Sequence, residues 1–312
     1  MNTAIYNGPS LENGLTLAQL LGFPYSEIES LASVSEQSYS IQRIPKKNGG
    51  HRIINEPNQT LKEIQRLVLE RILRQVALPN YIYGGVPGKG YISNARQHAG
   101  KSGLINADIK DFYPSVLAKH VHSVWLGLCG FPEDVSRMLT ALTTYEGCLP
   151  QGAPTSCDIG NLVLWDIEPA FVDNLSEWGY LYSRYVDDIS VSCIRVMEPR
   201  EIYLIVDKLR FVLALKGLEL NRAKLKISNS SCRMVIHNLN VNKGKPTKTK
   251  EERAKIRAAV RECEIRSQDI GRSSGEYRQL HLRTYGRVNE ILSLHKAEAS
   301  KLLDRLNAVK PV

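Results

Sequence analysis

The sequence lacks the local patterns that mark several common protein classes. Its 312 residues include six cysteines but no Cys-x-x-Cys pair, so no zinc site is indicated. No signal peptide, long apolar run or internal repeat is visible, which favours a reduced, cytoplasmic protein without membrane contact. The glycine-rich segment 84–90 is not a Walker phosphate loop, because Gly84 and Gly88 enclose three residues and Gly90 follows Lys89.

Acidic residues are fewer than basic ones. The chain has 41 Lys+Arg against 32 Asp+Glu, and its formal net charge of +9 favours a polyanionic partner. Residues 241–312 carry much of the excess, with 17 Lys+Arg against 9 Asp+Glu. Alone, such a basic tail is as often a solvated face as a nucleic-acid contact. The hydrophobic content of 43% is enough for a sizeable core.

The most informative pattern is a pair of adjacent carboxylates inside an apolar, β-branched segment. Asp187 and Asp188 interrupt the run from Leu181 to Cys193, which predicts a hairpin with both acids at its turn. Such pairs are more often solvated turn residues. Fixed side by side, however, they repel each other unless a cation compensates, and Asp108 supplies a third carboxylate at the end of a predicted strand.

Two further blocks complete a recognisable order. LPQGAPTS (149–156) lies between the acidic segments, and GLELNRAK (217–224) follows the second. In this order and spacing, the blocks resemble motifs A, B, C and D of a reverse transcriptase. The resemblance implies an α+β right-hand polymerase with fingers, a ferredoxin-like palm of antiparallel sheet plus helices, and a small helical thumb. We expect N-terminal helices and fingers in residues 1–103, a palm in 104–240 with a fingers insertion at about 118–148, and a basic thumb in 241–312.

The resemblance also implies a catalytic centre. Nucleotidyl transfer needs alignment and charge neutralisation more than covalent chemistry, and two Mg²⁺ ions supply both. We expect Asp108 and Asp187 to bridge the ions, with Asp188 as a supporting ligand and the carbonyl of Ile109 completing the shell. Lys224 matches the lysine that protonates the departing pyrophosphate, although Lys226 is a nearby competitor and an ordinary surface lysine is the alternative.

Nucleotide contacts are assigned by the same resemblance. Tyr113 takes the place of the steric-gate aromatic that crowds the 2′-oxygen and favours dNTPs, although a core aromatic is the alternative. The other expected dNTP contacts come from a basic hairpin lid, from backbone N–H groups after motif A and from motif B: Lys47, Arg52, Asp111, Phe112, Gln151 and Gly152.

A shorter block indicates which group of reverse transcriptases the chain resembles. Asn94-Ala95-Arg96-Gln97-His98 resembles the NAxxH block of bacterial retron reverse transcriptases. These enzymes copy a structured non-coding RNA into branched RNA-linked DNA (msDNA), prime from an RNA 2′-OH, and commonly work beside a separate effector protein in anti-phage defence. The resemblance thus implies this RNA, its RNA–DNA product and dNTPs as partners. We expect RNA contacts from Asn94, His98, Lys243, Lys245, Lys248 and Lys250. For His98, local capping or packing is the alternative.

Three features depart from the retron pattern. Val186 stands where the family usually has Ala, and Cys157 stands where it often has Pro. Val235-Ile236-His237-Asn238-Leu239 replaces a Val-Thr-Gly block. The alternatives are a group II intron-like or other defence-associated reverse transcriptase, or a non-catalytic RNA-binding scaffold. All three carboxylates are present, which argues against the scaffold.

Local patterns predict the remaining elements. A hairpin is expected around Asn48-Gly49-Gly50 and a strand over residues 234–241. Thr249 and Glu252 form a capping-box pattern at the start of one helix. Helical periodicity is also found over 15–21, 26–34, 61–76, 201–215 and from Arg287 to Val309.

Overall fold

The computed structural model describes residues 2–45 and 49–312, so the predicted nucleotide contact Lys47 lies outside the described residues. The chain divides into two compact units, the first made of Met1–Asn94 with Gly103–Ile227 and the second of Ala95–Ser102 with Ser228–Val312. Among the helices of the described residues, none has the length and apolar character needed to cross a bilayer.

Ten α-helices are described in the chain up to residue 227. Local sequence sets their ends: the Asn13 side chain accepts a hydrogen bond from Thr16 N at 3.1 Å to begin α1, and Gly22 ends it with a φ of 76°. Asn58 caps α3 in the same way, through Leu61 N at 2.9 Å. The helices are α1 (Gly14–Leu21), α2 (Tyr25–Ser33), α3 (Gln59–Arg71), α4 (Tyr91–Gln97), α5 (Phe112–Ser115), α6 (Ala118–Ser123), α7 (Glu133–Thr143), α8 (Ser156–Leu162), α9 (Glu168–Glu177) and α10 (Pro199–Ala214).

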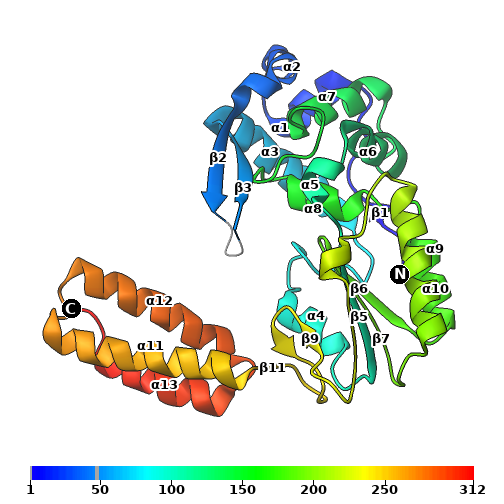
Figure 1. The fold of residues 1–312 in the computed structure, drawn as a ribbon. Helices are drawn as coiled ribbons and strands as arrows, with labels where there is room; N and C mark the ends of the chain where they lie inside the picture. Colours follow the sequence, from blue (N-terminus) through cyan, green and yellow to red (C-terminus); the bar gives the residue numbers. More distant parts are fainter. Residues whose placement is uncertain (1, 46–48) are drawn as a thin grey trace. The chain divides into compact units, whose positions relative to one another are not determined.

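The main sheet has the strand order β6-β7-β5-β8, with β5 (Gly103–Asp108), β6 (Leu181–Tyr185), β7 (Asp188–Cys193) and β8 (Lys226–Asn229). Strands β5 and β6 both pair antiparallel with β7. Helices α9 and α10 lie along one face of this sheet (Figure 1). Strands β5 and β7 are buried along nearly their whole length, which explains their continuous apolar and small-residue sequences.

A long hairpin precedes α3. Strands β2 (Tyr39–Pro45) and β3 (His51–Pro57) pair antiparallel in unbroken register from Tyr39 opposite Pro57 to Pro45 opposite His51, as predicted from the sequence. Most of its side chains are exposed. A smaller antiparallel pair joins β1 (Ile5–Tyr6) to β4 (Val76–Ala77).

The second unit contains a small sheet in the order β11-β10-β9, made of β9 (Val235–Ile236), β10 (Leu239–Asn240) and β11 (Thr247–Lys248). The expected single strand over 234–241 is therefore wrong. His237 and Asn238 have φ values of 48° and 62° and turn the chain back on itself. Both residue types are enriched in the left-handed region, but this pair is not the Asn-Gly signal of a tight hairpin.

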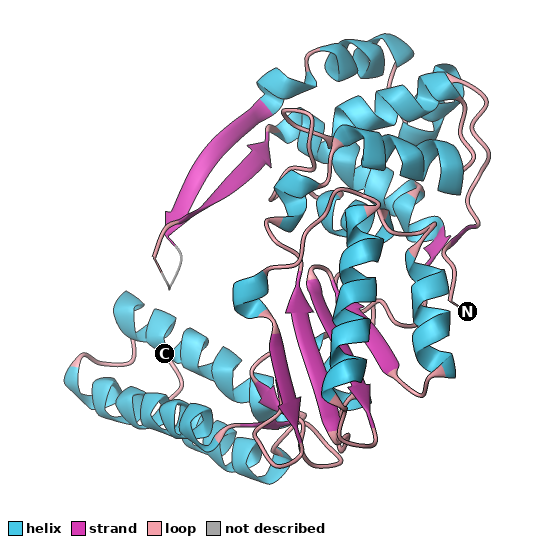
Figure 2. Ribbon diagram, turned by 45° about the vertical axis from the view of Figure 1, so that its right-hand side comes forward, coloured by secondary structure: helices cyan, strands magenta, loops and turns pink. Residues whose placement is uncertain are grey.

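The C-terminal helices α11 (Lys250–Asp269), α12 (Gly275–Leu292) and α13 (Lys296–Ala308) form a bundle (Figure 2). Thr249 caps α11 by accepting a hydrogen bond from Glu252 N at 3.1 Å. The single helix expected from Arg287 to Val309 is wrong, because the chain leaves helical geometry at His295. The Nε2 atom of His295 accepts a hydrogen bond from Lys248 N at 3.1 Å, so a contact distant in sequence holds the break.

The bundle has its own apolar core, which yields a stability prediction. Leu306 is fully buried in this core, whereas Leu282 on α12 is 70% exposed. Replacing Leu306 by Ala should lower the free energy of unfolding by about 2–5 kcal/mol, because burial is lost and a cavity remains. Leu282→Ala should change it by less than about 0.5 kcal/mol. Denaturant unfolding of the full chain measures both; equal effects would contradict this assignment of the core.

Candidate active site

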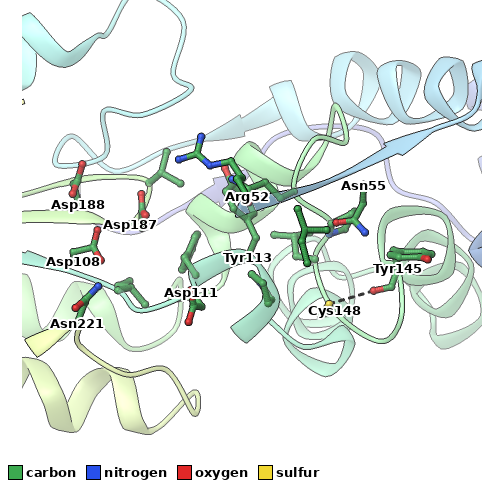
Figure 3. Close-up of a pocket in the computed structure, with 18 of the residues that line it drawn as sticks. Arg52, Asn55, Asp108, Asp111, Tyr113, Tyr145, Cys148, Asp187, Asp188 and Asn221 are labelled. Atoms are coloured by element: carbon green, nitrogen blue, oxygen red, sulfur yellow. Dashed lines mark hydrogen bonds between the residues drawn. The ribbon is translucent and has the colours of Figure 1, made fainter. Parts of the chain in front are cut away.

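The β6–β7 hairpin and the end of β5 bring the three acidic residues together. Asp187 lies in the turn, Asp188 begins β7, and the β5–β7 register places Asp108 directly opposite Asp188. The backbone N–H of Ile109 donates to the Asp187 carbonyl oxygen at 3.0 Å and ties the turn to β5. The predicted hairpin is thus present. Figure 3 shows the three carboxylates at the same end of a pocket.

The pocket has a volume of about 700 Å³ and lies within the first unit. Its walls come from β3, from the end of β5 and α5, from the segment before α8, from the Asp187 turn and from the segment before β8. Of the residues proposed from sequence to bind metal or nucleotide, those that line it are Arg52, Asp108, Ile109, Asp111, Phe112, Tyr113, Gln151, Asp187, Asp188 and Lys224.

The acidic end of the pocket carries an electrostatic cost. Burial, followed by repulsion from Asp187 and Asp108, raises the pKa of Asp188 from 3.8 to about 6. Burial and the Asp108 charge also raise the pKa of Asp187. Lys224 partly compensates: its Nζ atom lies 2.7 Å from Asp108 Oδ2, and this hydrogen bond raises the pKa of Lys224.

A divalent cation fits the donor set of this end, which consists of oxygen atoms on adjacent strands. Within residues 2–45 and 49–312, however, no three His, Cys, Asp or Glu side chains are already arranged as a closed metal site. The Lys224 ammonium supplies the nearest positive charge to Asp108. The carboxylates repel one another, so a bound cation would lower the pKa values that burial has raised.

The opposite side of the pocket is built on β3 and the LPQGAPTS segment. Asn55 N on β3 donates to the Gln151 carbonyl oxygen at 2.8 Å. Gly152 has a φ of 121°, and a Cβ there would come within 2.7 Å of Ile54 Cγ2. Gly152 is not one of the lining residues, so it supports the wall from behind. This close approach explains why glycine occupies the position.

Tyr113 lies on α5, one turn beyond the acidic end of β5, and is partly buried. Its ring lines the pocket (Figure 3). Its hydroxyl contacts the thiol of Cys157, and burial raises the pKa of Tyr113 well above its usual range. The preceding Asp111 has a left-handed φ of 42°, which turns the chain sharply between β5 and α5.

The residues expected to bind RNA fall into two groups. Lys243, Lys245 and Lys250 are exposed. In contrast, Lys248 pairs with Glu290 at 2.6 Å. Asn94 and His98 are buried, with exposed fractions of 1% and 0%.

The two buried residues are held inside the protein. The Asn94 Oδ1 atom accepts a hydrogen bond from Ser183 Oγ at 2.5 Å. Burial lowers the pKa of His98 to about 3, so its ring is neutral at physiological pH. Neither side chain presents a surface to a partner in this conformation.

Sequence reasoning missed several structural features that build the site. Asn221 lines the pocket, and its N–H donates to the Asp108 carbonyl oxygen at 2.8 Å. Val186 adopts a φ of 60° in the acidic turn. Arg184 and Glu168 form a fully buried ion pair beneath that turn. The only available signal was a charged residue, Arg184, inside an otherwise apolar strand.

Comparison with known proteins identifies the family. Residues 44–246 match the family model described as reverse transcriptase (RNA-dependent DNA polymerase). The chain is 31% identical over 316 residues to the Retron Se72 reverse transcriptase of Salmonella heidelberg (strain 579083-10), covering 100% of this chain and 83% of that protein. It is 26% identical over 310 residues to the Retron Ec48 reverse transcriptase of Escherichia coli, covering 95% and 76%.

A solved structure supports the fold. A telomerase from Candida albicans, in complex with a TWJ fragment of telomeric RNA, aligns with a TM-score of 0.50 and 11% identity over 91% of this chain and 67% of that one. This likeness confirms the predicted right-hand α+β fold. Reverse transcriptases generally use divalent metal ions, an RNA template and dNTPs. The chain belongs to the retron reverse transcriptases and is an RNA-directed DNA polymerase.

Proposed function

We propose that this polymerase copies a cognate structured non-coding RNA into branched RNA-linked DNA, priming from an RNA 2′-OH, within a retron that defends against phage through a separate effector protein. The retron relatives and the Asn94-to-His98 segment support this biology. The observation that carries the chemistry is the register of β5 with β7. It sets Asp108 against Asp188 at one end of a pocket that also contains Arg52 and Tyr113.

We assign the three acidic residues and the Ile109 carbonyl to two Mg²⁺ ions. When bound, such ions lower the pKa of the attacking hydroxyl and stabilise charge on the departing pyrophosphate. The protein's part is to hold the carboxylates in place through the β5–β7 ladder and the Ile109 N–H bond to Asp187. Lys224 must leave Asp108 for ions to bind there. The bond to Asp108 raises the pKa of Lys224 and keeps it protonated while no ion is bound. Once released from Asp108, Lys224 would lose this cause of its raised pKa and become a better proton donor to the pyrophosphate.

The nucleotide is assigned to the middle of the pocket. Arg52 would bind triphosphate oxygens with its planar guanidinium, and the N–H groups of Asp111 and Phe112 would add further donors. Tyr113 would crowd the 2′-position of the sugar, while Gln151 would line the base or sugar side. Gly152 acts indirectly, by letting β3 approach this wall.

Roles for the chain segments follow the same scheme. We assign residues 1–103 to N-terminal helices and fingers, 104–240 to the palm and 241–312 to the thumb. Because His98 is buried within the second unit, we propose that it shapes the RNA-binding surface rather than contacting RNA. Asn94 would act in the same indirect way. The exposed Lys243, Lys245 and Lys250 are the proposed phosphate contacts.

The first test removes a proposed metal ligand. Asp187→Asn should lower magnesium-dependent DNA synthesis on the cognate RNA by about a hundredfold or more, because one ligand charge is lost. RNA affinity should stay within about twofold, since the basic surface is unchanged. Primer extension and filter binding measure the two effects. Asp207→Asn, on the exposed face of α10, is the control. Full activity in Asp187→Asn would refute the assignment.

The second test uses the charge cost of the acidic turn. The pKa of Asp188 is higher in the folded chain, about 6, than its ordinary value of 3.8, so between these values the folded state binds more protons. In metal-free protein, the destabilising contribution of Asp188 should therefore disappear as pH falls from about 7 to 4. Protein atoms surround the Asp188 carboxyl, but the residue keeps much of its surface in contact with solvent, so screening limits its contribution to about 1 kcal/mol.

The measurement compares Asp188→Asn with the unchanged protein at several pH values. The variant should be more stable at pH 7 without metal, and this advantage should vanish near pH 4. Denaturant unfolding in the presence of a chelator reports the difference. A variant less stable than the parent at pH 7 would show that Asp188 is not under electrostatic strain.

The third test concerns sugar selection. Tyr113→Ala opens the space beside the 2′-position and should reduce the preference for dNTPs over NTPs by about tenfold or more. Tyr113→Phe keeps the ring and should retain the preference. Single-nucleotide incorporation with dNTP and NTP gives the ratio of kcat/KM values. Equal discrimination by all three proteins would reject Tyr113 as the gate.

A further inference from the structure

The turn that carries the acidic pair has an unfavourable backbone conformation. Val186 has a φ of 60°, and a β-branched residue in the left-handed region is a genuine outlier. The turn also packs tightly against the backbone at Gly84. A Cβ at Gly84 would lie 2.5 Å from Val186 Cγ2 and 2.8 Å from Val186 N. The surrounding structure must therefore hold Val186 in a backbone conformation that it would not adopt in an isolated hairpin.

A buried arginine makes the holding contact. Arg184, two residues before the middle of the turn, is 0% exposed. Its Nη1 donates to the Val186 carbonyl oxygen at 3.1 Å. Its Nη2 donates to the Asn161 carbonyl oxygen at 2.9 Å. One planar group thus joins the turn to helix α8.

Glu168 fixes the orientation of that guanidinium. Arg184 Nε lies 2.6 Å from Glu168 Oε1, and Nη2 lies 2.8 Å from Oε2, which makes a bidentate pair. The Tyr182 hydroxyl donates to Glu168 Oε1 at 2.6 Å. Both charged side chains are almost completely buried. The carboxylate is thereby held by two neighbouring strand residues and cannot rotate freely.

The network closes on the other side of the turn. The Asn161 Nδ2 atom donates to the Gly84 carbonyl oxygen at 2.6 Å. Val186 packs against the backbone of Gly84. Asn161 therefore has two contacts near the turn: its side chain binds the Gly84 carbonyl, and its own carbonyl accepts a hydrogen bond from Arg184.

Stability is a weak explanation for this pair. Replacing a buried ion pair by apolar residues of similar volume is often neutral or stabilising. What apolar residues or lysine cannot supply is a rigid fork with donors aimed at a carboxylate and two carbonyl groups at once. The geometry therefore points to a role in the shape of the turn.

We propose that Arg184, oriented by Glu168, is a positioning residue that holds the Val186 carbonyl and so fixes the left-handed turn presenting Asp187 and Asp188. This inference rests on the proposed role of those carboxylates. Without the arginine, Val186 relaxes toward negative φ and Asp187 moves. The nucleotide wall is held by a separate backbone bond, from Asn55 N to the Gln151 carbonyl oxygen, and should stay in place.

The test removes the fork without leaving a buried charge unpaired. The double variant Arg184→Met with Glu168→Leu should remain folded but lose about tenfold or more in kcat, with the KM for dNTP within about threefold. The control is the same exchange at Arg195 and Glu201, another bidentate pair in the same unit, which is partly exposed and does not reach the turn. That control should keep kcat within about twofold.

A glycine at the turn supplies the distinguishing readout. Glycine adopts left-handed φ readily, so adding Val186→Gly to the double variant should restore kcat severalfold. A purely structural role for the ion pair predicts no such rescue. Arg184→Lys, which keeps the charge but loses the fork, is a second variant; it should fold, lose kcat and be rescued in the same way.

Mn²⁺ binding followed by electron paramagnetic resonance gives a readout without polymerase chemistry. The double variant should bind Mn²⁺ about tenfold more weakly than the Arg195 and Glu201 control. If the unchanged protein binds Mn²⁺ but makes no DNA, the proposed function fails and this comparison still tests the positioning role. Folded Arg184 variants with control-level kcat and Mn²⁺ affinity, or losses that Val186→Gly does not reduce, would overturn the inference.

Discussion

The antiparallel pairing of β5 with β7 is the constraint on which the site depends. It runs from Gly103 opposite Cys193 to Asp108 opposite Asp188, so the last pair of the ladder sets two carboxylates against each other. Like charges in directly opposed positions destabilise a sheet. Two of the preceding pairs, Ile105 opposite Val191 and Ala107 opposite Ile189, are buried and apolar. Their packing offsets the repulsion at the end of the strands.

The pocket has the three carboxylates at one end and, on the opposite side, a wall that is held together by backbone contacts. The Asn55 N–H bond to Gln151 and the close approach of Ile54 to Gly152 join β3 to the segment before α8. These contacts depend on the backbone conformation, which is why glycine occupies position 152. The carboxylates, by contrast, depend on side-chain chemistry and on the turn that presents them. A buried polar network beneath the turn is therefore where the fold and the catalytic geometry meet.

Sequence reasoning reached the features that local rules control. The acidic hairpin, the strand ending at Asp108, the helix predicted over 15–21 and the cap of α11 at Thr249 depend on periodicity, turn residues and capping. It failed where contacts between residues distant in sequence determine the local structure. The break before α13 depends on the bond between Lys248 and His295.

Side-chain environment was equally beyond local rules. The buried positions of Asn94 and His98 arise from packing against segments far along the chain. Local packing was an open alternative for His98, but a five-residue motif could not decide between packing and RNA contact. The left-handed turn at Val186 and the pairing of Arg184 with Glu168 likewise exist only once α8, α9 and the sheet are assembled.

The central claim is that the carboxylates meeting at the end of the β5–β7 ladder bind the catalytic ions. Anomalous scattering from crystals grown with Mn²⁺ and an incoming dNTP tests it most directly. We expect anomalous peaks between Asp108 and Asp187, with Lys224 displaced from Asp108. A bound dNTP with no peak between these carboxylates, and with the Lys224 pair intact, would contradict the account.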